Sequence, residues 1–182
     1  MLICLTSCQN NDYTPKPRGY HRIELPEHAY QLNQTGCPFD IEIPHYTILT
    51  ADQSREAKPC WKNLEFPQFN AKLHLSYFRI SPESTLDQLT EDARTFVFKH
   101  TTKATAIEEF PIRIDSTNTV GLEYHIKGNT ASNYQFYITD REKHYLRGAL
   151  YFNEKPNLDS IQPVLQFIKE DISHLIRTIS WK

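Results

Sequence analysis

The sequence predicts an α+β domain in which an antiparallel sheet carries one helix on each face, forming a three-layer sandwich. Three observations lead to this prediction. Several short runs alternate apolar and polar residues, which is the period of a half-buried strand. The runs in the second half of the chain are joined by short polar links, which favour antiparallel pairing because parallel strands need long crossovers. Two other segments follow the helical period instead.

Three strands are expected before the first helix. Residues 39–43 and 71–77 alternate apolar with polar side chains, and residues 61–66 form a shorter run that ends at Pro67. The two alternating runs are expected to be half-buried, with one face of each strand in the core.

The first helix is expected from residue 84 to residue 100. Ser84-Thr85-Leu86-Asp87 matches a capping box, in which a serine hydroxyl and an acid satisfy otherwise unpaired backbone N–H groups. The apolar residues that follow share one helical face. They are Leu86, Leu89, Ala93, Phe96 and Val97.

Four strand-like runs follow at 107–114, 118–128, 132–140 and 143–153, and their short polar links predict a meander. The last run is apolar on both faces apart from Arg147, which indicates a central strand covered on two sides. A charge in such a position is expected to have a carboxylate partner. The alternative is that Arg147 binds a ligand.

The C-terminal helix has the clearest pattern, with apolar residues spaced i, i+3, i+4 and i+7 over about five turns. Ser160 is the expected N-cap, since it places Pro163 at N3, where a missing N–H has no intrahelical partner anyway. Asp171 and His174 are expected on the polar side of this helix, as a surface pair worth a few tenths of a kcal/mol.

The 182 residues suit one domain, expected over 37–182, that buries a sufficient core without a metal ion. The formal net charge of −2 and the scattered Lys and Arg residues give no basic track for a phosphate backbone. No nucleic-acid partner is expected.

The first eight residues match the end of a bacterial lipoprotein signal. Leu5-Thr6-Ser7-Cys8 fits the lipobox, in which the cysteine is acylated and becomes the mature N-terminus. The seven residues before Cys8 are too few for a complete signal peptide, so residues 1–8 are expected to be its truncated end. No run approaches the roughly 20 apolar residues of a membrane span. The alternative is a cytosolic protein whose first residues match by chance.

Residues 9–36 are expected to form an extended tether. Their prolines favour polyproline II backbone, and their aromatic residues are more apolar than a free linker needs, so part of this arm is expected on the domain or on a partner. Removing residues 12–30 is expected to abolish partner binding and leave the domain folded. The predicted partner-binding residues are Tyr13, Pro15, Pro17, Arg18, Tyr20 and Arg22.

Two cysteines remain in the mature chain, Cys37 and Cys60, and an even remainder in an exported protein indicates a disulfide. The alternative is a pair of buried free thiols. A zinc site is less favoured, because neither cysteine has a partner at CxxC spacing.

The chain carries no P-loop, GxGxxG, GxSxG or HExxH motif, so no catalytic residue, cofactor or metal ion is expected. Asp140 and His144 flank a predicted hairpin turn and are expected to serve turn geometry rather than a metal ion. His74 and His125 fall on the polar faces of their strands, where exposure is the simplest expectation.

The segments 12–30, 37–46, 60–77 and 149–176 resemble the GldD family of gliding-motility lipoproteins of Bacteroidetes, over essentially the whole mature chain. The resemblance implies a lipoprotein needed for gliding and for the linked type IX secretion machinery, with no established enzymatic activity. It makes Cys8 the lipid-bearing cysteine and puts Cys37 and Cys60 at the two family cysteine positions.

Two further expectations come with this resemblance. Residues 9–12, Gln-Asn-Asn-Asp, lack the acidic cluster that resembles a surface-export signal in these bacteria, which favours an anchored protein of the cell envelope that faces the periplasm. The order of helix, meander and long terminal helix resembles the Mog1/PsbP-like fold, a likeness that does not establish function.

The leading functional hypothesis is a non-enzymatic, membrane-tethered lipoprotein that binds other gliding and secretion proteins and contacts the membrane through acylated Cys8. One alternative is a periplasmic ligand-binding or hydrolytic enzyme that uses Arg147, His125 or the pair Asp140 and His144. The other is a periplasmic chaperone for exported adhesins.

Overall fold

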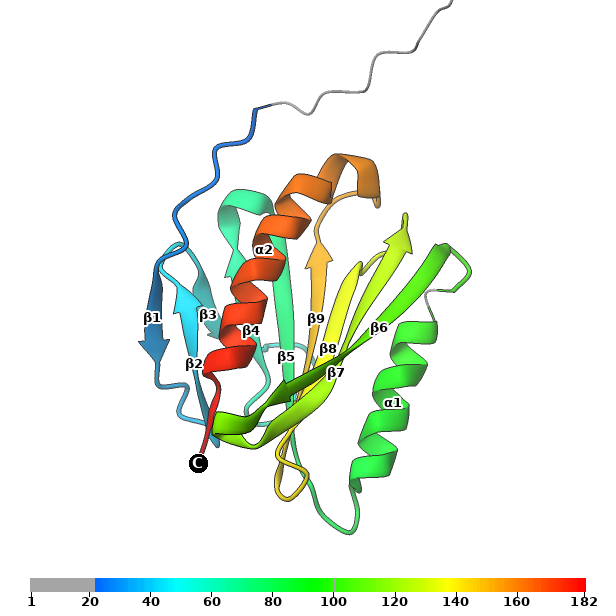
Figure 1. Ribbon diagram of the computed structural model, residues 1–182. Helices are drawn as coiled ribbons and strands as arrows, with labels where there is room; N and C mark the ends of the chain where they lie inside the picture. Colours follow the sequence, from blue (N-terminus) through cyan, green and yellow to red (C-terminus); the bar gives the residue numbers. More distant parts are fainter. Residues whose placement is uncertain (1–21, 100) are drawn as a thin grey trace, which may run out of the picture.

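Within residues 22–99 and 101–182, the part of the chain that the computed structural model describes, two antiparallel sheets pack with two α-helices (Figure 1). The strands are β1 (Tyr30–Asn33), β2 (Phe39–Pro44), β3 (Ile48–Ala51), β4 (Lys62–Phe66), β5 (Ala71–Arg79), β6 (Ala104–Ile114), β7 (Thr119–Gly128), β8 (Tyr134–Thr139), β9 (His144–Phe152) and β10 (Ser180–Trp181). The helices are α1 (Leu86–Phe98) and α2 (Leu158–Thr178). The larger sheet has the order β3-β4-β5-β9-β8-β7-β6, and the smaller one has the order β1-β2-β10.

The predicted meander is confirmed. Strands β6, β7, β8 and β9 pair with their neighbours in chain order, all antiparallel. Strand β5 then pairs with β9 along its whole length, from Ala71 opposite Phe152 to Arg79 opposite His144. This makes β9 a central strand, and it is buried on both faces over most of its length, as its two-sided apolar pattern predicts.

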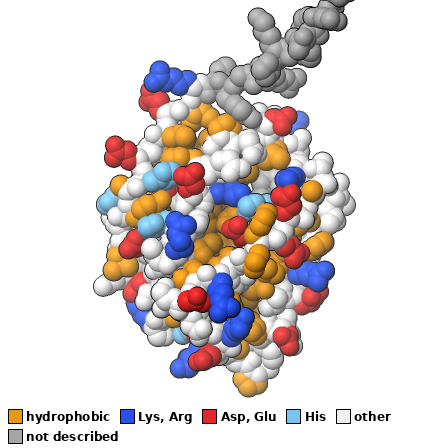
Figure 2. Space-filling view, in the orientation of Figure 1, with side chains coloured by type: hydrophobic (Ala, Val, Ile, Leu, Met, Phe, Trp, Pro, Cys, Tyr) orange, Lys and Arg blue, Asp and Glu red, His pale blue; other side chains and the backbone are white. Residues whose placement is uncertain are grey.

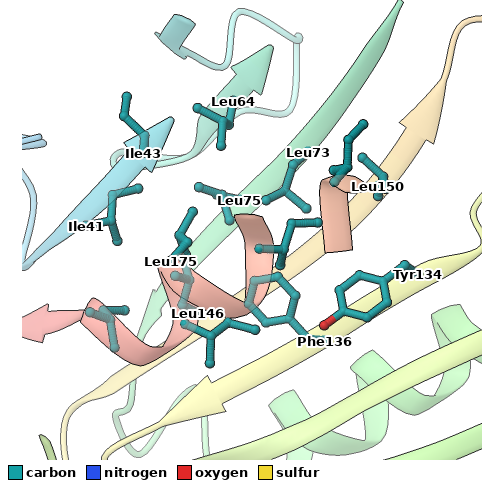
Figure 3. Close-up of a cluster of buried hydrophobic side chains, with 14 of the residues drawn as sticks. Ile41, Ile43, Leu64, Leu73, Leu75, Tyr134, Phe136, Leu146, Leu150 and Leu175 are labelled. Carbon is teal, nitrogen blue, oxygen red and sulfur yellow. The ribbon is translucent and has the colours of Figure 1, made fainter. Parts of the chain in front are cut away.

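One face of the large sheet packs against α2 and the small sheet. Leu73, Leu75, Phe136, Leu146 and Leu150 point from the sheet into this core (Figure 3). The apolar stripe of α2 and the inward residues of β2 close it from the other side, as Leu175, Ile41 and Ile43 show. The alternation of apolar and acidic residues in β2 therefore predicts its buried face correctly, but β2 belongs to a separate small sheet beside α2.

Helix α1 covers the opposite face of the large sheet, so the predicted three layers are confirmed. Leu89 and Ala93 pack on Tyr145, and Val97 packs on Tyr124. The buried Tyr145 hydroxyl donates a hydrogen bond to the carbonyl oxygen of Leu89 at 3.0 Å, which satisfies the one polar atom of that side chain.

The N-cap of α1 lies one residue after the predicted Ser84, and the capping box uses other partners. Thr85 is the N-cap, its hydroxyl accepts the backbone N–H of Gln88, and the Gln88 side chain accepts the N–H of Thr85. The predicted cap with Ser84 and Asp87 is wrong because the Ser84 backbone already pairs with Ser81 in a tight turn.

Helix α2 begins one turn before the predicted position. Its N-cap is Asn157 rather than Ser160, and Pro163 lies inside the helix. The earlier start is stabilised from outside the helix, because Asn129 Oδ1 accepts the N–H of Leu158 at 2.8 Å. A side chain 29 residues upstream in the sequence supplies this cap, so no local pattern could have indicated it.

The predicted disulfide is confirmed: Cys37 and Cys60 are joined, with their Cα atoms 5.6 Å apart. Cys37 precedes β2 and Cys60 precedes β4. The bond therefore ties the small sheet to the large one, and the alternatives of free thiols and a zinc site are excluded for this pair.

Candidate functional site

Most of the residues predicted to bind the membrane or a partner lie outside the described part of the chain. These are Cys8, Tyr13, Pro15, Pro17, Arg18 and Tyr20. Arg22 is the first described residue and is exposed. The lipid anchor and the partner-binding role of the arm therefore stay predictions.

The last part of the predicted arm belongs to the folded domain. Residues 30–33 form β1, which pairs with β2 from Tyr30 opposite Pro44 to Asn33 opposite Ile41. Before β1, the Gln68 side chain donates a hydrogen bond to the carbonyl oxygen of Glu24 at 2.7 Å. The chain is therefore fixed to the domain surface upstream of β1.

The arm is held most firmly by a buried carboxylate in α2. Asp171 is only 1% exposed. Its Oδ1 atom lies 2.7 Å from His28 Nδ1 and accepts the Tyr30 hydroxyl at 3.0 Å, and its Oδ2 atom accepts the hydroxyl of Tyr46. We call these four residues the Asp171 cluster. Three donors around one carboxylate meet the requirement that a buried charge be hydrogen-bonded.

The prediction that Asp171 and His174 form a surface pair is wrong. Asp171 turns into the interior toward residues from the arm and from the loop after β2. His174 instead lies 2.6 Å from Glu42 of β2 and stacks on the ring of Tyr30, with ring centroids 3.5 Å apart. A signal for Asp171 was present in the sequence, because it lies three residues after Ile168 and four before Leu175, on the apolar side of the helix.

Burial and the hydrogen bonds to Asp171 raise the pKa values of Tyr30 and Tyr46 far above the usual value for tyrosine. For both hydroxyls, burial is the larger cause and the hydrogen bond to Asp171 is the second. Both tyrosines are therefore protonated at any physiological pH and serve Asp171 as donors. The cluster is suited to holding the arm in place rather than to moving protons.

Beside the cluster, an open groove of about 530 Å³ runs across the outward face of α2. Its lining mixes cations, anions, histidines and aromatic rings, and Figure 2 shows such a mixture on this face of the molecule. The lining residues are His28, Tyr30, Glu123, Tyr134, Gln166, Lys169, Glu170, Ser173, His174 and Arg177. A groove with balanced charges and two aromatic residues is suited to contact with another protein surface.

His125, on β7, contacts Lys169 and Glu123 of the groove lining and is half-buried, not freely exposed as its place on the polar face suggested. Its ring packs between Phe110 and Tyr134, and its Nε2 atom lies 3.2 Å from Glu123. The Tyr134 hydroxyl also donates to Glu123, at 2.5 Å. These contacts explain His125 as a packing residue.

Asp140 serves the β8–β9 turn, as predicted, whereas the side chain of His144 is buried and contacts residues outside the turn. Asp140 Oδ1 accepts the backbone N–H groups of Glu142, Lys143 and His144 at 2.8–3.0 Å. The His144 ring lies 2.8 Å from the Tyr77 hydroxyl and stacks on Trp181. Within residues 22–99 and 101–182, no three His, Cys, Asp or Glu side chains are grouped so that they could hold a metal ion.

Among the described residues, no carboxylate pairs with Arg147, although its sequence context suggested such a partner. Its guanidinium lies over the ring of Phe96, 4.2 Å from the centroid, and donates one hydrogen bond to Gln135 Oε1 at 3.1 Å. The expectation is wrong because a cation–π contact and a neutral amide take the place of an ion pair.

The three-layer sandwich, the disulfide and the arm fixed on α2 define a small disulfide-bonded α+β domain, of the kind found in exported proteins. The chain belongs to the family of the gliding motility lipoprotein GldD, whose family model matches residues 10–181. Curated proteins include no match to this chain. No helix in the described ranges 22–99 and 101–182 has the length and apolarity to cross a membrane.

Among solved structures, the chain is similar to cyanobacterial PsbP (CyanoP) from Synechocystis sp. PCC 6803, determined in solution. The two share 14% sequence identity over 89% of this chain and 98% of that chain, with a TM-score of 0.49. At this level the similarity concerns the fold and says nothing about activity or partners.

Proposed function

We propose that this gliding motility lipoprotein is a non-enzymatic component of the gliding and type IX secretion machinery, anchored by a lipid on Cys8 and acting through protein contacts at the periplasmic side of its membrane. The observation that carries the proposal is the family match over residues 10–181. The lipobox that ends at Cys8 lies just before the matched region.

The attachment of the arm sets the reach of the domain. His28 is bonded to Asp171, so at most residues 9–27 separate the anchor from the domain. In a fully extended polyproline II conformation, these 19 residues span about 60 Å at about 3.1 Å per residue. Partners of this domain are therefore expected within about that distance of the membrane surface.

The groove across α2 and the arm before it are the surfaces we propose for partner contact. The groove holds Lys169 and Arg177 close to Glu123 and Glu170, so its charges favour a partner with a mixed pattern over a polyanion. His125 packs against Phe110, and Asp140 accepts backbone N–H groups of the β8–β9 turn. Both side chains therefore have structural contacts, which argues against the hydrolytic alternative.

The test is crosslinking in living cells followed by mass spectrometry, comparing the native chain with a Cys8→Ser variant and with a deletion of residues 13–21. The deletion ends before Glu24 and His28, whose contacts hold the arm on the domain. A deletion of 12–30 would also remove two donors of the Asp171 cluster and so confuse loss of binding with unfolding.

We expect Cys8→Ser to release the protein from the membrane fraction and to stop gliding. The 13–21 deletion is expected to keep its fold and lose crosslinks to secretion components. A variant with residues 13–21 scrambled keeps the length of the arm, so it separates the loss of the sequence from the loss of spacing. Unchanged crosslinks and gliding in both variants would contradict the proposal. Full gliding in His125→Ala, Asp140→Ala and Arg147→Ala variants is expected, since no reaction depends on these residues.

A further inference from the structure

Helix α1 covers only part of its face of the large sheet and leaves a pocket beside it. Cross-strand pairing puts His74 next to Ala149, and Ser76 next to Arg147, on this face. The pocket has a volume of about 230 Å³. It is lined by Asp52, Trp61, His74, Ser76, Arg147, Ala149 and Tyr151.

Arg147 has more hydrogen-bond donors than the protein uses. A guanidinium carries five N–H groups, and among the described residues only Gln135 Oε1 accepts one of them. No carboxylate oxygen in that part of the chain lies within 4.0 Å of the guanidinium nitrogens. Burial lowers the pKa of Arg147, yet an arginine remains charged at neutral pH. Half-buried cations of this kind are normally paired.

The other ionisable groups of the pocket do not supply that pair. Asp52 is occupied by a turn, accepting the backbone N–H of Ser54 at 2.9 Å and its hydroxyl at 3.2 Å. Burial lowers the pKa of His74, so its ring is neutral at pH 7. Asp52 therefore has its carboxylate oxygens occupied by the turn, whereas Arg147 keeps N–H groups that a ligand carboxylate could accept.

The aromatic walls of the pocket are held in place by packing and hydrogen-bond contacts. The Trp61 indole N–H donates to the carbonyl oxygen of Tyr77 at 3.2 Å, and its ring packs edge-on against Phe78. The Tyr151 ring packs edge-on against His74, with centroids 5.4 Å apart. Two held aromatic side chains beside an arginine with free donors form a site for a flat group that ends in an anion.

We propose that this pocket binds a monocarboxylate with an aromatic or apolar body, whose carboxylate accepts two N–H groups from the guanidinium of Arg147. A carboxylate is favoured over a phosphate, because its planar geometry fits the guanidinium fork and it brings less negative charge close to Asp52 in the same lining. The proposal goes beyond the role of the chain as a gliding motility lipoprotein and does not depend on it.

The test is an NMR titration of the full chain with benzoate, with its neutral isostere benzamide and with inorganic phosphate. We expect benzoate to shift the amide signals of Ser76 and Ala149 and to bind at least about tenfold more tightly than benzamide, because a charge-assisted bidentate contact is lost in the amide. Equal affinity for benzamide, tighter binding of phosphate, or no binding of benzoate would overturn the proposal.

Arg147→Gln is expected to weaken benzoate binding about tenfold or more. Arg113→Gln is the matched control, since Arg113 is exposed on β6, is paired with Asp115 and is not part of this pocket. Ser76→Leu fills the pocket and leaves Arg147 in place, so it is expected to block benzoate as well. Unchanged affinity in both pocket variants would overturn the proposal, and thermal melts without ligand report whether each variant folds.

The carboxylate can come from a small acid or from the end of a peptide. N-acetylphenylalanine and its amide separate these two sources. Tighter binding of N-acetylphenylalanine than of benzoate assigns the site to a peptide C-terminus, and the reverse order assigns it to a small acid. In either case the amide is expected to bind at least about tenfold more weakly than the acid.

Discussion

His28 and Asp171 are 143 positions apart in the sequence, and their side chains meet at 2.7 Å. The contact joins the segment that leads to the predicted membrane anchor with the middle of the longest helix. It also explains how a carboxylate that is 1% exposed remains in the core, since Tyr30 and Tyr46 complete its shell of donors.

Replacing Asp171 by Ala is expected to destabilise the domain by about 2–4 kcal/mol, because the change leaves the donors of His28, Tyr30 and Tyr46 without an acceptor. The measurement is the midpoint of urea unfolding followed by circular dichroism. Asp159→Ala, at an exposed position in the first turn of the same helix, is the control and is expected to cost less than about 1 kcal/mol. Equal effects of the two changes would contradict the assigned role of Asp171.

Alkaline pH is expected to unfold the domain in step with tyrosine ionisation. Burial, alone or with neighbouring groups, raises the pKa of seven of the 10 tyrosines in the chain. For Tyr124 the raised pKa is about 12. A raised pKa means that the folded state keeps protons that the unfolded chain loses near pH 10. Stability is therefore complete below about pH 10 and falls as the pH rises above it.

The measurement is a titration of phenolate absorbance near 295 nm together with circular dichroism. The two signals are expected to change together above about pH 10 for most of the tyrosines. Tyr46→Phe removes one of the groups with the largest shift, and it is expected to make stability fall less steeply above that pH. Ionisation of nearly all tyrosines with the fold intact would show that these hydroxyls are accessible, against the burial seen here.

Loss of the disulfide is expected to destabilise the domain by about 3 kcal/mol, because the bond closes a loop of moderate length between Cys37 and Cys60. The double variant Cys37→Ser and Cys60→Ser and the reduced native protein are expected to melt at the same lowered temperature. A digest without reductant identifies the linked peptides. A melting temperature that does not respond to reductant would show that the bond is not formed.

Gly148→Ala is expected to cost about 1–3 kcal/mol, because Gly148 lies opposite Phe136 and a Cβ at this position would overlap its ring. Phe136→Leu removes the ring that the new Cβ would overlap, and it lowers stability by itself because it leaves a cavity. In a double-mutant cycle, the cost of Gly148→Ala is expected to shrink in the Phe136→Leu background, measured by urea unfolding. Additive costs would indicate that the two residues do not compete for space.

Much of the fold follows from local patterns, and the exceptions have a common cause. Strands β5, β7 and β9 and both helices follow from hydrophobic period and length. Strand β1, with the sequence Tyr-Gln-Leu-Asn, and β10, with two residues, have no period to detect and exist only because β2 lies between them. These two strands form only through tertiary pairing, so a local pattern could not indicate them.

The site was harder to predict than the fold, because its key groups are defined by partners far away in the sequence. An aspartate in an amphipathic helix is normally at the surface, and only the donors from the arm and from the loop after β2 make burial of Asp171 tolerable. The apolar neighbours of Arg147 mark it as unusual, but Phe96 and Gln135, which contact it, come from helix α1 and from strand β8.

The position of the Asp171 cluster has a mechanical consequence. Strand β1 begins at Tyr30, which pairs with Pro44 of β2. Tension along the arm would therefore begin to separate β1 from β2 at this end. His28 and Tyr30 bind Asp171 at this same end. A pull from the membrane would therefore be transferred to α2 and the large core before any hydrogen bond of the small sheet is loaded.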